Sequence, residues 1–160
     1  MRKLFIIFLI YLFNTTPIFA EVVKKINISG NSRVNEETIK IYGGIKINED
    51  YSEQDLNRIL IDLYSTNFFK DVRIDLSNNN LNIYLIEHPV INELVIIGEP
   101  SNKYKEEIKK IIRSKEKNSY IKSNVAKDIE LIKQLYSSVG YNFSEIDVKI
   151  RELDKLNLDL

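Results

Sequence analysis

The sequence predicts an α+β protein made of two tandem units. Each unit has the order β-α-α-β-β, with a three-stranded mixed sheet covered on one face by two helices. The main observation is a restart in the middle of the chain. A strand pattern ends at Glu87, and a second apolar run, residues 90–97, begins directly after Pro89, which lacks an N–H donor and blocks simple continuation of a strand. The opening apolar run of each unit also ends at a glycine, Gly30 or Gly98.

In the first unit, residues 21–88, alternating segments predict three strands. Residues 22–29 alternate and end in a Gly-Asn-Ser turn. Residues 69–76 and 81–87 alternate on either side of an asparagine-rich turn, which predicts a hairpin. The residues expected to face the core are Val22, Ile26, Ile28, Val72, Ile74, Leu76, Leu81, Ile83 and Leu85.

Helix-start signals place two helices between the first strand and the hairpin. Asn35 and Ser52 are N-cap candidates, and Asp55 would complete a capping box with Ser52. The first helix is expected to end at Gly43-Gly44, and the second near Asn67.

The second unit, residues 89–160, repeats this order. Strands are expected at residues 90–97, 141–150 and 153–160, and helices at residues 103–113 and 122–139. Because the chain stops inside the last of these strands, we expect that strand to be truncated and the chain to be the N-terminal part of a longer protein. A soluble protein of two repeats is the alternative.

The first 20 residues have the three parts of a secretory signal peptide. Arg2 and Lys3 give a basic start, residues 4–13 form an unbroken apolar run, and Ala20 is a small residue at the end. A membrane-spanning helix needs roughly 20 apolar residues, so this run is too short for one. We therefore expect residues 1–20 to be removed and residues 21–160 to work outside the cytoplasm.

Composition limits the class of function. The chain has 23 Lys and Arg and 23 Asp and Glu, so a dedicated nucleic-acid binder is not expected. It has no cysteine and one histidine, His88, which excludes zinc-thiolate sites, cysteine nucleophiles and His-based metal clusters. Glutamates are adjacent in sequence at Glu36-Glu37 and at Glu106-Glu107. Within each pair the two carboxylates point to different faces of their helix. We expect no catalytic site, no metal and no cofactor.

Together these features resemble POTRA domains, the periplasmic repeats of outer-membrane protein assembly factors of the BamA family. The first strand ends in a Gly-Asn turn, and a tyrosine-containing helix end runs into an aromatic hairpin start at residues 64–69 and 136–141. Residues 87–91, followed by residues 96–98, resemble the family's boundary between its first and second repeats. The resemblance covers residues 21–160, although Glu99 stands where the first unit has Asn31.

The resemblance implies a protein at the periplasmic face of the outer membrane. It would bind unfolded β-barrel precursors and accessory assembly lipoproteins or periplasmic chaperones. It would meet the membrane only through a C-terminal barrel that is absent from this chain. Two alternatives stay open: the POTRA region of a two-partner secretion or other barrel transporter, and an exported enzyme whose catalytic part lies beyond residue 160.

The binding site is expected at sheet edges, where an extended client segment can pair with unused backbone groups. The resemblance places the second strand of each unit, residues 69–76 and 141–150, at an edge. Charges in the first of these strands fit equally well an edge that is protected against aggregation. The candidate binding residues are Phe69, Lys70, Asp71, Val72, Arg73, Ile74, Tyr141, Phe143, Ile146 and Val148.

Overall fold

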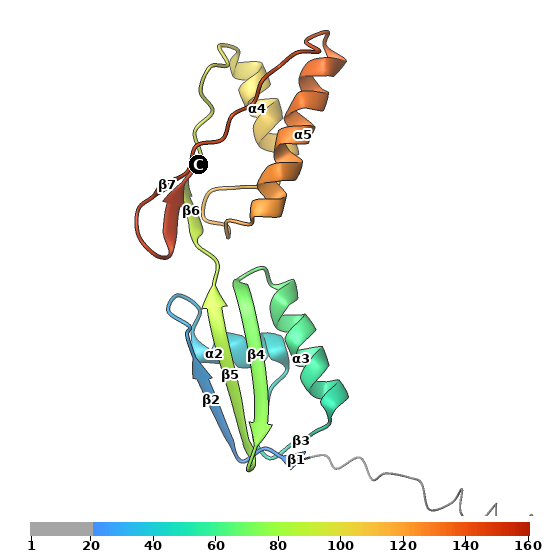
Figure 1. The fold of residues 1–160 in the computed structure, drawn as a ribbon, viewed down its shortest axis with the longest axis vertical. Coiled ribbons are helices and arrows are strands. Elements are labelled where there is room, and N and C mark those ends of the chain that lie inside the picture. The colour runs from blue at the N-terminus through green and yellow to red at the C-terminus, as the bar shows by residue number, and fades with distance from the viewer. Residues whose placement is uncertain (1–20) are drawn as a thin grey trace, which may run out of the picture.

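The computed structural model describes residues 21–160, which form two units placed end to end along one long axis (Figure 1). The expected signal peptide, residues 1–20, lies outside the described residues. Each unit has one three-stranded mixed sheet and two helices, which confirms the predicted fold class. None of the helices within residues 21–160 is both long enough and apolar enough to cross a membrane.

In the first unit the last strand in the sequence is the central strand of the sheet. The sheet has the order β2-β5-β4, with β2 parallel and β4 antiparallel to β5. A small antiparallel pair, β1 with β3, closes one end of the unit. The elements are β1 Glu21–Val22, β2 Lys25–Ser29, α2 Glu36–Gly43, β3 Asp50–Tyr51, α3 Glu53–Ser65, β4 Phe69–Ser77 and β5 Asn80–Glu87.

Both helices of this unit begin at the predicted caps. Asn35 accepts a hydrogen bond from the Thr38 N–H, and Ser52 and Asp55 form a capping box at the start of α3. The hydrogen bonds from Ser52 also hold the pKa of Asp55 below its ordinary value. Helix α2 ends at Gly44, whose left-handed conformation (φ 60°) a glycine adopts without steric cost.

The first strand differs from its prediction. It is interrupted between β1 and β2, and Val23 is fully buried whereas Val22 is 40% exposed. The Val23 N–H donates to the Glu49 carbonyl, and the Asn48 N–H donates to the Val23 carbonyl. This pairing with the loop before β3 turns Val23 into the core in place of Val22.

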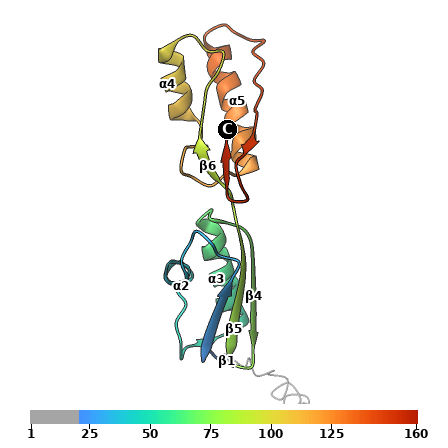
Figure 2. The same cartoon turned by 90° about the vertical axis from the view of Figure 1, so that its left-hand side faces the viewer.

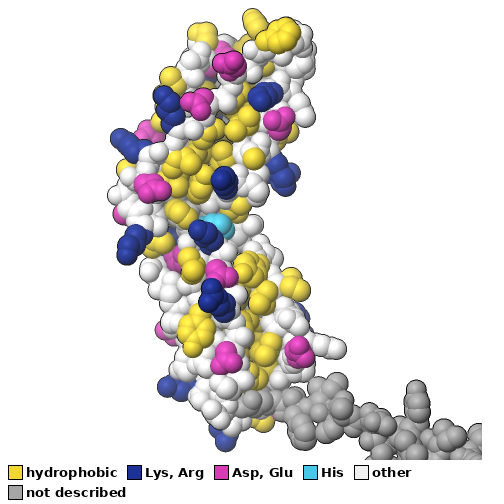
Figure 3. Space-filling model, viewed as in Figure 1, with side chains coloured by type: hydrophobic (Ala, Val, Ile, Leu, Met, Phe, Trp, Pro, Cys, Tyr) yellow, Lys and Arg dark blue, Asp and Glu magenta, His cyan; other side chains and the backbone are white. Residues whose placement is uncertain are grey.

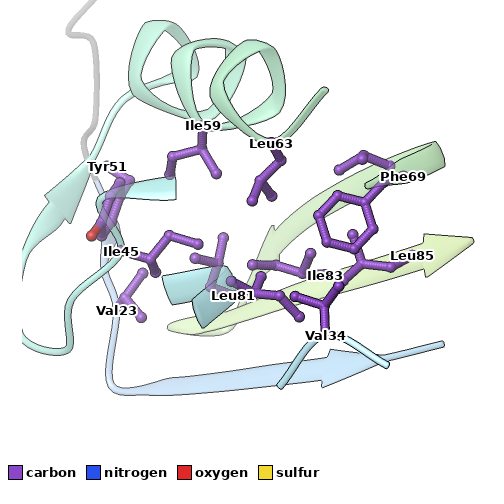
Figure 4. Close-up of a cluster of buried hydrophobic side chains, with 12 residues drawn as sticks. Val23, Val34, Ile45, Tyr51, Ile59, Leu63, Phe69, Leu81, Ile83 and Leu85 are labelled. Atoms are coloured by element: carbon purple, nitrogen blue, oxygen red, sulfur yellow. The ribbon is translucent and has the colours of Figure 1, made fainter. Parts of the chain in front are cut away.

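The core of the first unit lies between the sheet and α3 (Figure 4). Ile59 and Leu63 on successive turns of α3 are fully buried, as are the central-strand residues Leu81 and Ile83. The inward alternation predicted for β4 and β5 is confirmed, with Val72 and Leu85 also buried. The twelve residues of this core are Val23, Val34, Ile39, Ile45, Tyr51, Ile59, Leu63, Phe69, Val72, Leu81, Ile83 and Leu85.

A buried carboxylate holds the turn after β2 against the end of β5. Glu87 accepts hydrogen bonds from the backbone N–H groups of Ser32, Arg33 and Val34, at 2.9, 3.0 and 2.9 Å. The Arg33 guanidinium lies 3.7 Å from the same carboxylate. The turn can approach this closely because Gly30 has no side chain: a Cβ there, at φ +85°, would lie 2.0 Å from the Leu85 carbonyl oxygen.

The second unit has the same topology with much shorter strands. Its sheet has the order β6-β8-β7, and β6 is parallel to β8. Two helices cover the sheet, as in the first unit (Figure 2). The elements are β6 Val90–Glu93, α4 Asn102–Ile111, α5 Lys122–Ser138, β7 Arg151–Glu152 and β8 Asn157–Asp159.

Three strand predictions in this unit are wrong in extent. Residues 141–150 form no strand, the first strand covers only Val90–Glu93 of the predicted 90–97, and the last covers only Asn157–Asp159 of the predicted 153–160. All three differences have the same physical reason. A segment forms a strand only beside a partner strand that accepts and donates its backbone hydrogen bonds. The short central strand β8 gives its neighbours few such groups.

We expect Gly30→Ala to destabilise the first unit strongly. Positive φ and a collision with the Leu85 carbonyl should together lower the free energy of unfolding by about 2–4 kcal/mol. Gly98→Ala is the matched control, because Gly98 has the same φ of +85° and nothing within 4 Å of its Cβ position, so it should cost only about 1 kcal/mol. Urea unfolding of residues 21–160 measures both; equal losses would contradict the close approach at Gly30.

Glu87→Ala should also destabilise the first unit, because it leaves three N–H groups without their acceptor. The expected loss in the free energy of unfolding is roughly 2–4 kcal/mol, with a smaller loss for Glu87→Gln, whose amide oxygen still accepts. Glu37→Gln, which removes an exposed pair with Lys40, is the control and should change little. If Glu87→Ala unfolded at the same urea concentration as the control, this carboxylate would not hold the turn.

Candidate functional site

The outer edge of β4 is the first candidate site. The Val72 N–H donates to the Tyr64 hydroxyl, 3.1 Å away, and therefore points away from β5. Residues two apart in a strand direct their backbone groups to the same side, so Ile74 and Leu76 also face the open edge. Their N–H and C=O groups are available to a further strand.

Tyr64 on the last turn of α3 covers the beginning of this edge. Its hydroxyl receives the Val72 N–H and donates to Asp71 Oδ1 at 3.2 Å. The open part of the edge is therefore its second half, from Ile74 to Ser77. The sequence analysis noted a tyrosine at this helix end but missed that its hydroxyl occupies an edge N–H. Its place on the last helical turn before the strand was the available signal.

The side chains of β4 divide into core and solvent groups. Phe69 and Val72 are buried and Ile74 is half-buried, so these predicted binding residues belong to the core side. Lys70 and Arg73 are exposed, and Arg73 Nε lies 3.0 Å from Asp71 Oδ2. A partner at this edge would thus be recognised mainly through the backbone.

The second candidate site is a cavity of about 670 Å³ in the second unit. One wall is residues 94–99, the opposite wall is residues 144–149, and Leu160 lies at one end. In Figure 2 these walls are the yellow and red traces that flank α5. Figure 3 shows hydrophobic side chains gathered on the face of this unit that is seen in Figure 1. The residues of α4, its C-cap and α5 that line the cavity are Ile108, Ile112, Val125, Asp128, Ile129, Ile132 and Tyr136.

The structure separates the predicted binding residues of the second unit into two groups. Ile146 and Val148 are half-buried and line the cavity. Tyr141 and Phe143 are exposed, with Phe143 99% exposed, and neither lines the cavity. The predicted residues are therefore not brought together into one site.

Glu99 and Tyr136, which both line the cavity, form a polar contact between the turn after the first strand and α5. The Tyr136 hydroxyl donates to Glu99 Oε2, and Glu99 Oε1 accepts the Ser101 N–H at 2.6 Å. The hydrogen bond from Tyr136 lowers the pKa of Glu99. Burial, and then the bond to Glu99, raises the pKa of Tyr136 to about 12. The rings of Tyr104 and Tyr141 pack beside Tyr136.

A buried carboxylate on α5 holds the segment that follows the C-terminal end of α4. Asp128 accepts the N–H groups of Arg113 and Ser114 at 2.6 and 2.9 Å. Sequence reasoning missed this residue. The signal was an acidic residue within the apolar stripe of a helix, next to Ile129 and one turn after Val125.

The one histidine lies at the joint between the units. Burial lowers the pKa of His88, and the nearby charges of Lys70 and Arg33 lower it further. Among residues 21–160, no three His, Asp or Glu side chains are grouped as ligands for a metal ion.

Comparison with known proteins gives consistent matches. The sequence matches the model of the POTRA family, described as "Surface antigen variable number repeat", over residues 21–87 and 89–160. It is 28% identical over 151 residues to the outer membrane protein assembly factor BamA of Neorickettsia risticii, covering 93% of this chain and 20% of that protein. It is 32% identical over 76 residues to BamA of Neisseria meningitidis, covering 48% of this chain and 10% of that protein. The chain therefore spans a fifth or less of the length of these curated relatives.

Solved structures share the fold. The N-terminal domain of Omp85 from Thermosynechococcus elongatus superposes with a TM-score of 0.54 at 13% identity, covering 86% of this chain and 60% of that one. A structure of POTRA domains 1–3 of Omp85 from Anabaena gives a TM-score of 0.51 at 12% identity, covering 89% and 61%.

We expect Tyr136→Phe to raise the pKa of Glu99 toward its ordinary value of 4.5, because the hydrogen bond from Tyr136 is the main cause of the lowering. The folded pKa is depressed, so the stabilisation from Glu99 is present above about pH 4.5 and is lost as pH falls through the folded pKa. A carbon-13 NMR titration of the Glu99 carboxyl measures the change. Tyr104→Phe, which removes no bond to Glu99, should leave the titration in place; equal shifts in both variants would contradict the assignment.

Proposed function

The chain belongs to the POTRA family, and from this premise we propose that its two units are the periplasmic part of an outer-membrane protein assembly factor that binds unfolded β-barrel precursors. The open second half of β4 carries this proposal, since it offers backbone donors and acceptors beside a folded sheet. The role consists of binding alone and requires no catalysis, cofactor or nucleic acid.

The chemistry of the edge suits this class of partner. Strands of outer-membrane barrels alternate between apolar and polar residues and differ widely in sequence. Pairing through the main chain gains hydrogen bonds with little demand on sequence, so one edge can receive many different precursors. The charged side chains Lys70 and Arg73 on β4 keep the same edge from joining other folded copies. Protection and client binding are therefore compatible on this strand.

Accessory assembly lipoproteins or periplasmic chaperones belong to the same proposal. Two exposed apolar surfaces separate from the β4 edge support it, one on each side of the sheet. On α2, Ile41 and Tyr42 are exposed large hydrophobic residues, and on the outer face of β5 so are Tyr84 and Ile86. Apolar side chains of this kind are common where folded proteins meet. The proposed location of both units is the periplasmic face of the outer membrane.

The test is an NMR titration of residues 21–160 with a peptide of alternating apolar and polar residues from a barrel strand. We expect the amide signals of Ile74 and Leu76 to shift most, because their backbone groups face the open edge, and the Val72 amide to shift less, because Tyr64 occupies it. Tyr64→Phe should extend the shifts to Val72.

The control is the same peptide with its backbone N–H groups methylated at alternate positions, which keeps the side chains and removes the donors. It should produce no shifts along β4. Shifts of equal size with both peptides would show binding through side chains, and an absence of shifts along β4 with the unmodified peptide would remove the proposal.

A further inference from the structure

We propose that His88 makes the joint between the two units sensitive to pH. While its ring is neutral, the ring holds the second unit at one angle to the first, and protonation of the ring releases that angle. The inference rests on the contacts at the joint and is independent of the proposed function.

The angle between the units depends on a short segment of chain. Within residues 21–160, each extensive contact between helices and strands lies inside one unit, as for β2 with β5 or α4 with α5. The chain passes from Glu87, the last residue of β5, to Val90, the first residue of β6, through His88 and Pro89 alone. The direction of one unit relative to the other is therefore set by these two residues and by what they contact.

Backbone hydrogen bonds hold this segment at both ends. The His88 N–H donates to the Phe68 carbonyl of the first unit at 2.9 Å, and the Pro89 carbonyl accepts the Tyr120 N–H of the second unit at 2.7 Å. Between these two bonds, the ring of Pro89 fixes its own φ and restricts the residue before it to extended conformations. Few backbone torsions remain free, so one side-chain contact can select the angle.

The ring of His88 makes such a contact across the joint. The residue is half-buried, and its ring donates a hydrogen bond to the backbone of Tyr120, just before α5 of the second unit. On the side of the first unit the ring faces two cations, Lys70 at the start of β4 and Arg33 in the turn after β2. Figure 3 shows the histidine side chain, in cyan, at the surface between the two units.

The surroundings of the ring favour its neutral form. Burial lowers the pKa of His88, the charges of Lys70 and Arg33 lower it further, and the bond to Tyr120 offsets only part of this lowering. The adjacent carboxylate of Glu87 is directed toward the turn after β2, where it accepts three N–H groups and faces Arg33. A proton on the His88 ring therefore adds a third positive charge beside two others in a half-buried place.

A charged ring gains free energy by turning into water, away from Lys70 and Arg33, and this movement breaks its bond to Tyr120. Because the pKa of His88 is depressed in the fixed arrangement, that arrangement is fully favoured above the ordinary value of 6.5. It is lost as the pH falls through the lower value. The second unit can then turn about the joint while the backbone bonds at Phe68 and Tyr120 remain.

The experiment measures distances between the units. The chain has no cysteine, so two introduced cysteines can carry spin labels at chosen positions. Asn57→Cys on α3 and Gln134→Cys on α5 place one label on an exposed residue of each unit. Pulsed electron–electron double resonance on residues 21–160 gives the distribution of distances at about pH 7.5 and about pH 5, the range in which histidine titrates. We expect a narrow distribution at the higher pH and a shifted, broader one at the lower.

Three variants separate the charge of the ring from its shape. His88→Gln cannot gain a proton and keeps an N–H donor for Tyr120, so its distribution should be the same at both pH values. His88→Lys is charged at both and should give the low-pH distribution throughout. Lys70→Gln leaves the histidine in place and removes a neighbouring cation, so the pKa of His88 should rise and the midpoint of the change should move to higher pH.

A distance distribution that stays constant while an NMR titration shows the His88 ring gaining its proton would overturn the proposal. A change with pH that persists in His88→Gln would also overturn it, because the change would then belong to other groups. If His88→Lys does not fold, the opposite responses expected of His88→Gln and Lys70→Gln still decide. No peptide is present in this experiment, so its result and that of the titration along β4 are independent.

Discussion

Three backbone N–H groups bound by the Glu87 carboxylate determine how the first unit closes and where the second begins. They hold the turn after β2 to the last residue of the central strand. The following peptide is fixed from both sides, because the His88 N–H donates to the Phe68 carbonyl and the Pro89 carbonyl accepts the Tyr120 N–H. The central strand of one sheet thus leads into the first strand of the next through a short, hydrogen-bonded joint.

The two units differ in the length of the central strand and in the number of residues that they bury. Of the 18 hydrophobic residues that are buried within residues 21–160, twelve lie in the first unit, where β5 runs the full length of the sheet, and six in the second, where β8 is short. Helices α4 and α5 form nonetheless, since their backbone hydrogen bonds are internal. The apolar faces of these two helices line the cavity of the second unit.

The sequence predicted what is encoded locally. The caps at Asn35 and Ser52 and the hairpin of β4 and β5 depend on neighbouring residues, and all are present. Features that depend on distant partners were not predicted correctly. The strand expected at residues 141–150 is absent, and Val23 is buried in place of Val22. The buried carboxylates of Glu87 and Asp128 were overlooked. Of the candidate binding residues, those on β4 lie on an edge strand, and their role in binding stays a prediction. Those of the second unit are divided between a cavity wall and open solvent, because alternation alone does not show whether a pairing strand is present.

The placement of the central strand last in each unit also governs the order in which structure can form. Strand β2 pairs with residues 55 positions further along the chain, as in the Asn27 to Asn82 side-chain hydrogen bond, and β2 and β4 never pair with each other. While the chain is made from its N-terminus, Lys25–Ser29 and Phe69–Ser77 therefore wait as unpaired segments until Asn80–Glu87 arrives between them. Such long-range closure is slow relative to helix formation and exposes apolar strands to aggregation meanwhile. Each unit consequently acquires its sheet in one late, cooperative step.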